Sequence, residues 1–430
     1  MKRSIGSLLC FSVLLQAATI HDLFQALRHQ PQTRLDEMQS RYAKLASRKV
    51  RDAFYPTATL FATYEHYNAP TNLRPLSPTE SLALGKSNEP LPFATTIERI
   101  GADVQMPLFV KELFSLSEAA KARMQSARAK KRLNFLQNEA TILGDNAQWL
   151  YLVASRQAID ARIRSIQKSL EDARIAVQSG KAPGIRVDKL EAALLRLQNG
   201  ANDLDIAVNE IKSRLTALTG IRLQNPVALH RRASASLKEE KLFALDPLRH
   251  TLKAKRKELD AQKDRLYPKL IAKATWSENY GQNAVAYQPG SADDVHRGYG
   301  SYAFNLSIPL FEKSRYTAIE QARIAWQKER YALQKEEQEL TARAEALQKN
   351  LSLHRRAAEL AKKESAAQRK LLRYAKVAYR TGRISEEEYL RYEEALMEAQ
   401  SKIARAEALQ WQTLAQLAVI YGNDLAELVE

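Results

Sequence analysis

Met106-Pro-Leu-Phe109 closes a stretch in which polar and apolar residues alternate, and the same pattern returns 202 positions later as Ile308-Pro-Leu-Phe311. Ser179-Gly-Lys181 returns at the same offset as Thr381-Gly-Arg383. The offset also relates two further pairs, Glu191-Ala-Ala-Leu194 with Glu393-Glu-Ala-Leu396, and Leu218-Thr-Gly220 with Ile420-Tyr-Gly422. An offset that stays constant over more than a hundred residues indicates a tandem duplication without a net insertion.

The spacing of glycine and proline predicts long helices between these landmarks. The chain has 14 of each among 430 residues, which excludes collagen-like and turn-rich all-β folds. Residues 310–381 contain neither, and residues 108–179 contain only Gly144. A helix of 72 residues would be about 108 Å long. In the first copy we expect a break at Gly180 and a return helix over 186–219 that ends at Gly220. In the second copy we expect a break at Gly382 and a return helix over 384–421 that ends at Gly422.

Apolar residues in these runs recur in alternating steps of three and four, which indicates coiled-coil packing. The alternative, an amphipathic helix on a globular body, does not suit such lengths. The expected seams are Leu133, Leu136, Ala140, Leu143, Ala147, Leu150 and Ala154 in the first copy, and Leu340, Ala344, Leu347, Leu351, His354, Ala358 and Ala361 in the second.

Four segments of about ten residues change to a period of two, which is the length and pattern of an outer-membrane β-strand. They lie near 56–67, 97–107, 268–280 and 299–309. Four strands cannot sit in lipid as an open sheet, because the edge amides would be unsatisfied. Either the strands form a soluble sheet or several chains share one barrel, and three chains would give twelve strands. The proline-rich stretch between the first two strands is expected to be loop.

The N-terminus has the features of a secretory signal peptide. Lys2-Arg3 precedes an apolar run from Ile5 to Leu15, and small residues follow at Ala17 and Ala18. Cleavage there would remove Cys10, the single cysteine. A membrane-anchoring or buried N-terminal helix is the alternative. No later run is long and apolar enough for a transmembrane helix.

The expected fold is mainly α with a small β part, built from two tandem repeats of a strand pair and a long coiled-coil hairpin. Shorter helices are expected over 21–54 and 247–266. The expected division of the chain is a signal peptide at 1–18, a first repeat at 19–220 with its long hairpin at 108–220, a linker at 221–245, a second repeat at 246–422 with its hairpin at 310–422, and a tail at 423–430.

The formal charge is +17, but the basic residues are interleaved with glutamate along the helices. No zinc finger or aromatic RNA-binding motif accompanies them, so solvated helix faces are a better explanation than nucleic-acid binding. The sequence has no phosphate-binding loop, no histidines at metal-ligand spacing and no catalytic constellation. We therefore expect neither a cofactor nor an enzyme.

Taken together, the chain resembles the TolC-like outer-membrane efflux protein family over about residues 20–425. The resemblance rests on the duplication, the Tyr-Pro pairs at 55–56 and 267–268, the two Pro-Leu-Phe motifs and the glycine-centred helix turns. It implies a homotrimer in which a twelve-stranded outer-membrane β-barrel, in contact with lipid, continues into a periplasmic α-helical barrel. Such proteins are passive exit ducts that dock with a periplasmic adaptor and an inner-membrane pump or secretion ATPase.

The resemblance also places the helix turns at the periplasmic tip. The implied adaptor contacts are Ser179, Gly180, Lys181, Thr381, Gly382 and Arg383, and the implied pore constriction includes Tyr379, Asp188 and Glu388. Arg186, Arg391 and the Pro183-Gly184 insertion depart from the family pattern. Glu386, Glu387 and Glu388 have a second explanation, since carboxylates stabilise any helix N-terminus.

Two other classes of protein also have long helices. A periplasmic adaptor would carry one hairpin between two β-rich halves, whereas this sequence carries two equal hairpins. A soluble coiled-coil scaffold would leave the signal peptide and the alternating strands unexplained.

Overall fold

The computed structural model of the chain describes residues 19–84, 86, 91–232, 236–284 and 293–430. The signal peptide expected at 1–18, with Cys10, lies outside the described residues. The chain divides into two compact units. The sheet unit comprises Ser40–Ala127 and Leu248–Leu333. The helical unit comprises Arg128–Pro247, Gln334–Glu430 and the described part of Met1–Gln39.

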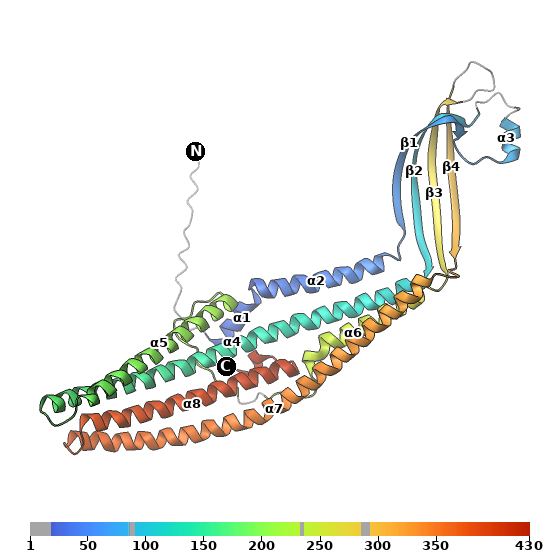
Figure 1. Ribbon diagram of the computed structural model, residues 1–430. Coiled ribbons are helices and arrows are strands. Elements are labelled where there is room, and N and C mark those ends of the chain that lie inside the picture. Colours follow the sequence, from blue (N-terminus) through green and yellow to red (C-terminus); the bar gives the residue numbers. More distant parts are fainter. Residues whose placement is uncertain (1–18, 85, 87–90, 233–235, 285–292) are drawn as a thin grey trace, which may run out of the picture. The chain divides into compact units, whose positions relative to one another are not determined.

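The sheet unit holds one antiparallel sheet with the order β1-β2-β3-β4 (Figure 1). Its strands are β1 (Thr57–Asn72), β2 (Phe93–Val110), β3 (Lys269–Ala284) and β4 (Asp293–Ser307). The central pair joins the two repeats, with Val104 opposite Ala274. The strands have 15 to 18 residues rather than the expected ten. Backbone pairing continues past the alternating segments into polar stretches, as at Thr96 opposite Gln282, which lie outside the segments expected near 97–107 and 268–280.

The proline-rich stretch after β1 contains a short helix, α3 (Pro78–Leu84), where loop alone was expected. Ser77 precedes it, and its Oγ accepts a hydrogen bond from the Glu80 amide at 3.1 Å. A serine cap followed by proline at the first helical position favours a helix start. The sequence therefore carries a helix-start signal at Ser77-Pro78, and the expectation of loop alone is wrong over Pro78–Leu84.

The chain has four long helices, labelled in Figure 1, namely α4 (Lys111–Gln178), α5 (Ile185–Thr219), α7 (Lys313–Arg380) and α8 (Glu386–Tyr421). The first part of α4, up to Ala127, and the first part of α7, up to Leu333, belong to the sheet unit, and the rest belongs to the helical unit. The long helices α4 and α7 have 68 residues each, not the expected 72. They start later because the Pro-Leu-Phe motifs stay non-helical: β2 continues to Val110 and α7 begins only at Lys313. At about 1.5 Å per residue, each helix is still about 100 Å long.

Burial confirms the predicted seams. Leu351, Ala358 and Ala361 are buried on α7, as are Leu136, Leu143 and Ala147 on α4. Helix α4 also buries Ile142 and Trp149 on a further face, which the single predicted seam missed. Those residues belong to a core with α1 (Ile20–Arg28), α5, α8 and α9 (Leu425–Leu428).

The helix expected over 21–54 is two helices, α1 and α2 (Pro31–Asp52). Pro31 disfavours helical geometry at Gln30 and starts the second helix. Residues before the second repeat form a 3-10 turn, η1 (Phe243–Leu245), and then α6 (Asp246–Asp264). As predicted, α5 and α8 end at Gly220 and Gly422, both in the left-handed conformation. Within the described ranges, no helix is both long enough and apolar enough to cross a membrane.

Candidate functional site at the hairpin ends

The turn after α4 is fixed by two backbone hydrogen bonds. The Lys181 amide donates to the Ala176 carbonyl at 2.8 Å and the Gly180 amide donates to the Val177 carbonyl at 3.0 Å. This pairing is a Schellman cap, which needs a left-handed residue, and Gly180 has φ +70°. The Ser179 hydroxyl donates back to the Ile175 carbonyl at 2.9 Å.

The turn after α7 repeats this geometry atom by atom. The Arg383 amide donates to the Ala378 carbonyl at 2.8 Å, and Gly382 has φ +68°. Thr381 donates its hydroxyl to the Val377 carbonyl at 3.1 Å. Each residue lies 202 positions after its counterpart, so the duplication inferred from the sequence extends to the turn geometry.

Beyond the glycines the two hairpins differ. In the second, the rings of Tyr379 and Tyr389 stack across the turn, 5.3 Å apart and 20° from parallel. The same positions in the first repeat are Val177 and Val187. The second hairpin therefore has a stacked aromatic pair between its helices that the first hairpin lacks.

The two return helices also start differently. Ser385 caps α8, with its Oγ accepting from the Glu388 amide at 3.1 Å. The cap of α5 is Gly184, which has no side chain to bond with. Glu386, Glu387 and Glu388 fill the first turn of α8, where the helix dipole favours anions.

Three ion pairs connect α4 to α8 just above the turns. Arg162 lies 3.3 Å from Glu394, Arg164 lies 2.9 Å from Glu393, and Lys168 lies 3.3 Å from Glu386. We call these six residues the hairpin clamp. Because one member of each pair is on each hairpin, the clamp holds the two hairpins together.

Lys168 is the most strongly held member of the clamp. It bonds to Glu171 at 3.0 Å within α4 as well as to Glu386 on α8. The hydrogen bonds to Glu171 and then to Glu386 raise the pKa of Lys168 to about 12. The lysine therefore stays charged at any physiological pH.

The structure places the residues expected at this site as follows. Ser179, Gly180, Lys181, Thr381, Gly382 and Arg383 form the two turns and are all exposed. Tyr379 lies against Tyr389, whereas Asp188 and Glu388 are exposed on the first turns of α5 and α8. Among the described residues, no hydrogen bond or ion pair joins Asp188 to Glu388.

Sequence reasoning missed Tyr389 and the hairpin clamp. Tyr389 follows Tyr379 by ten residues across a glycine turn, a spacing that could have suggested the stack. The clamp had no such signal, because charges occur every few residues along both helices and nothing in the sequence aligns one helix with the other. Arg391, which departs from the family pattern, pairs with Glu387 at 2.6 Å on its own helix.

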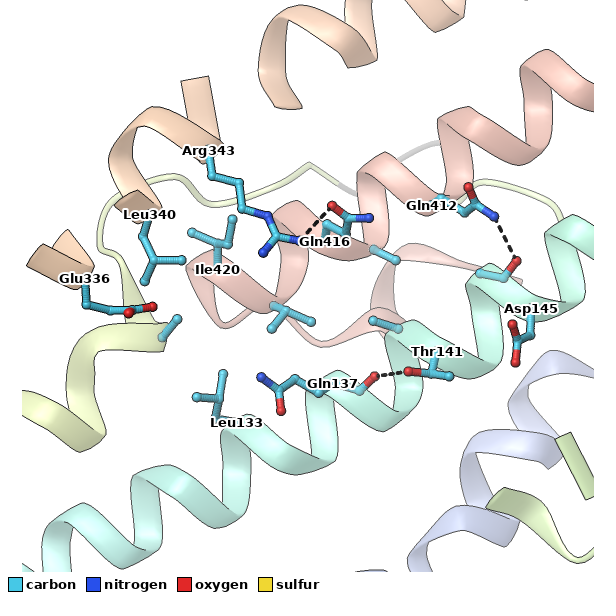
Figure 2. Close-up of a pocket in the computed structure, with 15 residues that line it drawn as sticks. Leu133, Gln137, Thr141, Asp145, Glu336, Leu340, Arg343, Gln412, Gln416 and Ile420 are labelled. Atoms are coloured by element: carbon cyan, nitrogen blue, oxygen red, sulfur yellow. Dashed lines mark hydrogen bonds between the residues drawn. The ribbon is translucent and has the colours of Figure 1, made fainter. Parts of the chain in front are cut away.

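A cavity of about 480 Å³ lies among α4, α7 and α8, farther along these helices from the hairpin turns (Figure 2). Arg343 on α7 donates to the Gln416 side chain at 3.3 Å, and Gln412 donates to the Gly144 carbonyl at 3.5 Å. These amides connect helices to one another, which is a packing role. Over the described ranges, no three histidine, cysteine, aspartate or glutamate side chains come close enough to hold a metal ion.

Part of the sequence matches a known protein family. Residues 240–423 match the outer membrane efflux protein family, and this range contains the whole second repeat expected at 246–422. In a sequence search, no curated protein matches the chain.

Solved structures match nearly the whole chain. The Campylobacter jejuni CmeC outer membrane channel has a TM-score of 0.69 at 13% identity, covering 95% of this chain and 85% of that one. The Neisseria gonorrhoeae MtrE outer membrane channel has a TM-score of 0.68 at 16% identity, covering 95% and 90%. The Vibrio cholerae outer membrane protein VceC has a TM-score of 0.65 at 15% identity, and the match covers 94% of this chain and 96% of that one. The chain therefore has the fold of the TolC-like outer-membrane channels, and its residues 240–423 match the outer membrane efflux protein family.

Proposed function

We propose that the protein is the outer-membrane exit duct of a tripartite efflux or type I secretion system. It would let substrates pass without an energy source of its own, from a periplasmic adaptor and an inner-membrane transporter to the exterior. The observation that carries the proposal is the pair of equal hairpins, each joined to two strands of one sheet. An adaptor with a single hairpin would not have this arrangement.

The sheet supports a shared barrel. The apolar side chains of Leu60, Tyr302 and Phe304 are 84%, 84% and 66% exposed, a face that lipid would cover. Strands β1 and β4 are the edges of a sheet that is too small to close by itself. A homotrimer would pair these edges between copies and give twelve strands, an even number within the known range.

In this arrangement the hairpin ends would form the periplasmic tip. The exposed turn residues, Ser179 to Lys181 and Thr381 to Arg383, would contact the adaptor. Tyr379, Asp188 and Glu388 would belong to the constriction of the pore. Opening would splay the coiled coils, and the hairpin clamp would resist it, because each of its ion pairs bridges both hairpins.

Conductance of the purified protein in a planar bilayer tests the proposal. We expect Tyr379→Ala and Glu388→Ala to open more readily than the parent. Tyr331→Ala, an exposed tyrosine far from the turn on the same helix, should behave like the parent. Unchanged opening in both tip variants would reject these residues as the constriction. Absence of any conductance in the parent would reject the duct itself.

A further inference from the structure

The half of α7 nearest the turn, from Leu351 to Arg380, has three distinct faces. Leu351, Ala358, Ala361, Ser365 and Ala375 are buried. They follow one another in steps of seven, three, four and ten residues, so they lie along one side of the helix. Ion pairs at the border of this face, such as Lys362 with Glu407 at 2.8 Å, show that it packs on α8.

A second face is apolar but exposed. Leu353, Leu360 and Tyr374 are 60%, 57% and 61% exposed, and Ala367 completes their seven-residue spacing. At about 100° per residue, this line lies roughly 200° around the helix from the packed face. A neighbouring copy in the proposed trimer would cover it.

The third face is basic and is also exposed. It carries nine cations and only one carboxylate, Glu359. Its cations are Arg355, Arg356, Lys362, Lys363, Arg369, Lys370, Arg373, Lys376 and Arg380. We call this set the basic ridge. It lies about 50° to 155° around the helix from the packed face, between that face and the exposed apolar line.

Most of the ridge lacks an internal counter-charge. Lys362 pairs with Glu407, and the Lys370 Nζ lies 5.8 Å from the centroid of the Tyr374 ring. No other ion pair is made by a ridge residue within the part of the chain that the structure describes. Concentrating like charges on one helix costs stability, so the hairpin itself gains nothing from them.

The first repeat confirms that the fold does not need the ridge. At the offset of 202, the nine positions on α4 hold one lysine, one arginine, one aspartate and one glutamate, which sum to zero. These positions are Val153, Ala154, Asp160, Ala161, Gln167, Lys168, Glu171, Arg174 and Gln178. The two repeats share their seams and turns but not this charge.

The spacing of the ridge identifies the shape of its partner. Arg355, Lys362, Arg369 and Lys376 are seven residues apart, and Arg356, Lys363 and Lys370 form a second row with the same spacing. Rows with a seven-residue repeat stay aligned along a left-handed supercoil, where charges beside the seam choose the partner helix. A lipid surface or a flexible polyanion would require positive charge but no such register.

We propose that the basic ridge docks an acidic α-helix of a partner protein, one that carries glutamate or aspartate at seven-residue spacing. The inference rests on the proposed function in that the partner would be the periplasmic adaptor. The recognition would depend on the basic ridge, which only the second repeat carries, and on acidic residues of the partner helix at the matching seven-residue spacing.

Binding to the purified full-length trimer tests the ridge, with a designed two-helix peptide hairpin as the probe. One probe carries two glutamate rows at seven-residue spacing, and a second carries glutamine in the same positions. The ridge variant is Arg355→Gln, Lys362→Gln, Arg369→Gln and Lys376→Gln together. The matched control removes four exposed cations elsewhere, through Lys189→Gln, Arg196→Gln, Lys313→Gln and Lys328→Gln.

We expect the acidic hairpin to bind the parent and the control variant alike, more weakly as salt is raised. The ridge variant should bind at least about tenfold more weakly, since several ion pairs are lost together. Equal binding by the ridge variant would overturn the proposal. So would equal binding of an unstructured acidic peptide or of anionic lipid vesicles, which would show that charge suffices without a helix.

The ridge variant must also remain a conducting trimer. If light scattering shows that it falls apart into single chains, the ridge is an interface between copies and the proposal is wrong. If the parent trimer binds no acidic helix but conducts in a bilayer, the ridge proposal fails while the duct stands. If the parent does not conduct, the proposed function fails by itself.

Discussion

Among the described residues, four glycines adopt the left-handed conformation, and they differ in what surrounds them. Gly180 and Gly382, in the hairpin turns, have open space where a Cβ would be added. At Gly422, with φ +79°, an added Cβ would lie 2.6 Å from the Phe243 ring. The sequence predicted all four as helix ends, because a glycine after a long apolar repeat is the usual cap.

Replacing these glycines by alanine should therefore have unequal effects. Gly382→Ala should cost about 1–2 kcal/mol, the strain of a left-handed alanine alone. Gly422→Ala should cost more, because Phe243 must also move. Thermal unfolding of the two variants in detergent checks this order, and a larger loss in Gly382→Ala would contradict it.

Glu139 is a buried carboxyl group in the middle of α4. Its burial, reinforced by the nearby Asp424, raises the pKa of Glu139 to about 8, and Arg132 and Arg28 offset this only in part. Arg132 lies 3.1 Å from Asp424, which caps α9. The group therefore lies where the C-terminal segment packs on α4.

This raised pKa predicts that stability falls as pH rises. Between about pH 4.5 and 8 the folded chain keeps a proton on Glu139 that the unfolded chain releases, so folding weakens across that window. One pKa unit corresponds to about 1.4 kcal/mol, so the loss amounts to a few kcal/mol. The melting temperature of Glu139→Gln should vary less between about pH 5 and about pH 8 than that of the parent. An identical pH dependence in both proteins would contradict the assignment.

At the scale of the elements, the hairpin clamp is the feature that links α4 and α8. Its pairs are partly exposed, with 24% of the Lys168 side chain and 47% of the Glu386 side chain accessible. Exposed pairs contribute about 0–1 kcal/mol each. The clamp is therefore weak enough to be released in opening.

Charge reversal tests the clamp. Lys168→Glu and Glu386→Lys should each increase the open probability in a planar bilayer, because like charges then face each other across the hairpins. The double variant should return toward the parent, since the pair is restored with its charges exchanged. If the double variant opens as readily as the single ones, direct pairing of the two residues is not what keeps the hairpins together.

The elements show how far the sequence determines the fold. Helix seams, turns and the repeat could be predicted, because each follows from periodicity within one segment. Strand ends could not be predicted, since pairing extends past the alternating segments, as at Thr96 opposite Gln282. The clamp and the buried Trp149 depend on how different helices align, and no local pattern records that.

At the scale of the whole molecule, the exposed apolar line on α7 bears on assembly. We expect Leu360→Asp to shift the purified protein from trimers toward single chains, because a charge would enter the covered seam. Ala366→Asp, on the basic face of the same helix, should remain trimeric. Light scattering distinguishes the two outcomes, and a trimer that tolerates Leu360→Asp would place the contact between copies elsewhere.

In the proposed assembly, three copies of this chain form one duct in the outer membrane. Electrophoresis of the outer-membrane fraction, with and without heating, tests it most directly. We expect a band of three chains in the unheated sample that is replaced by a band of one chain after boiling. A single-chain band confined to the soluble fraction would contradict it.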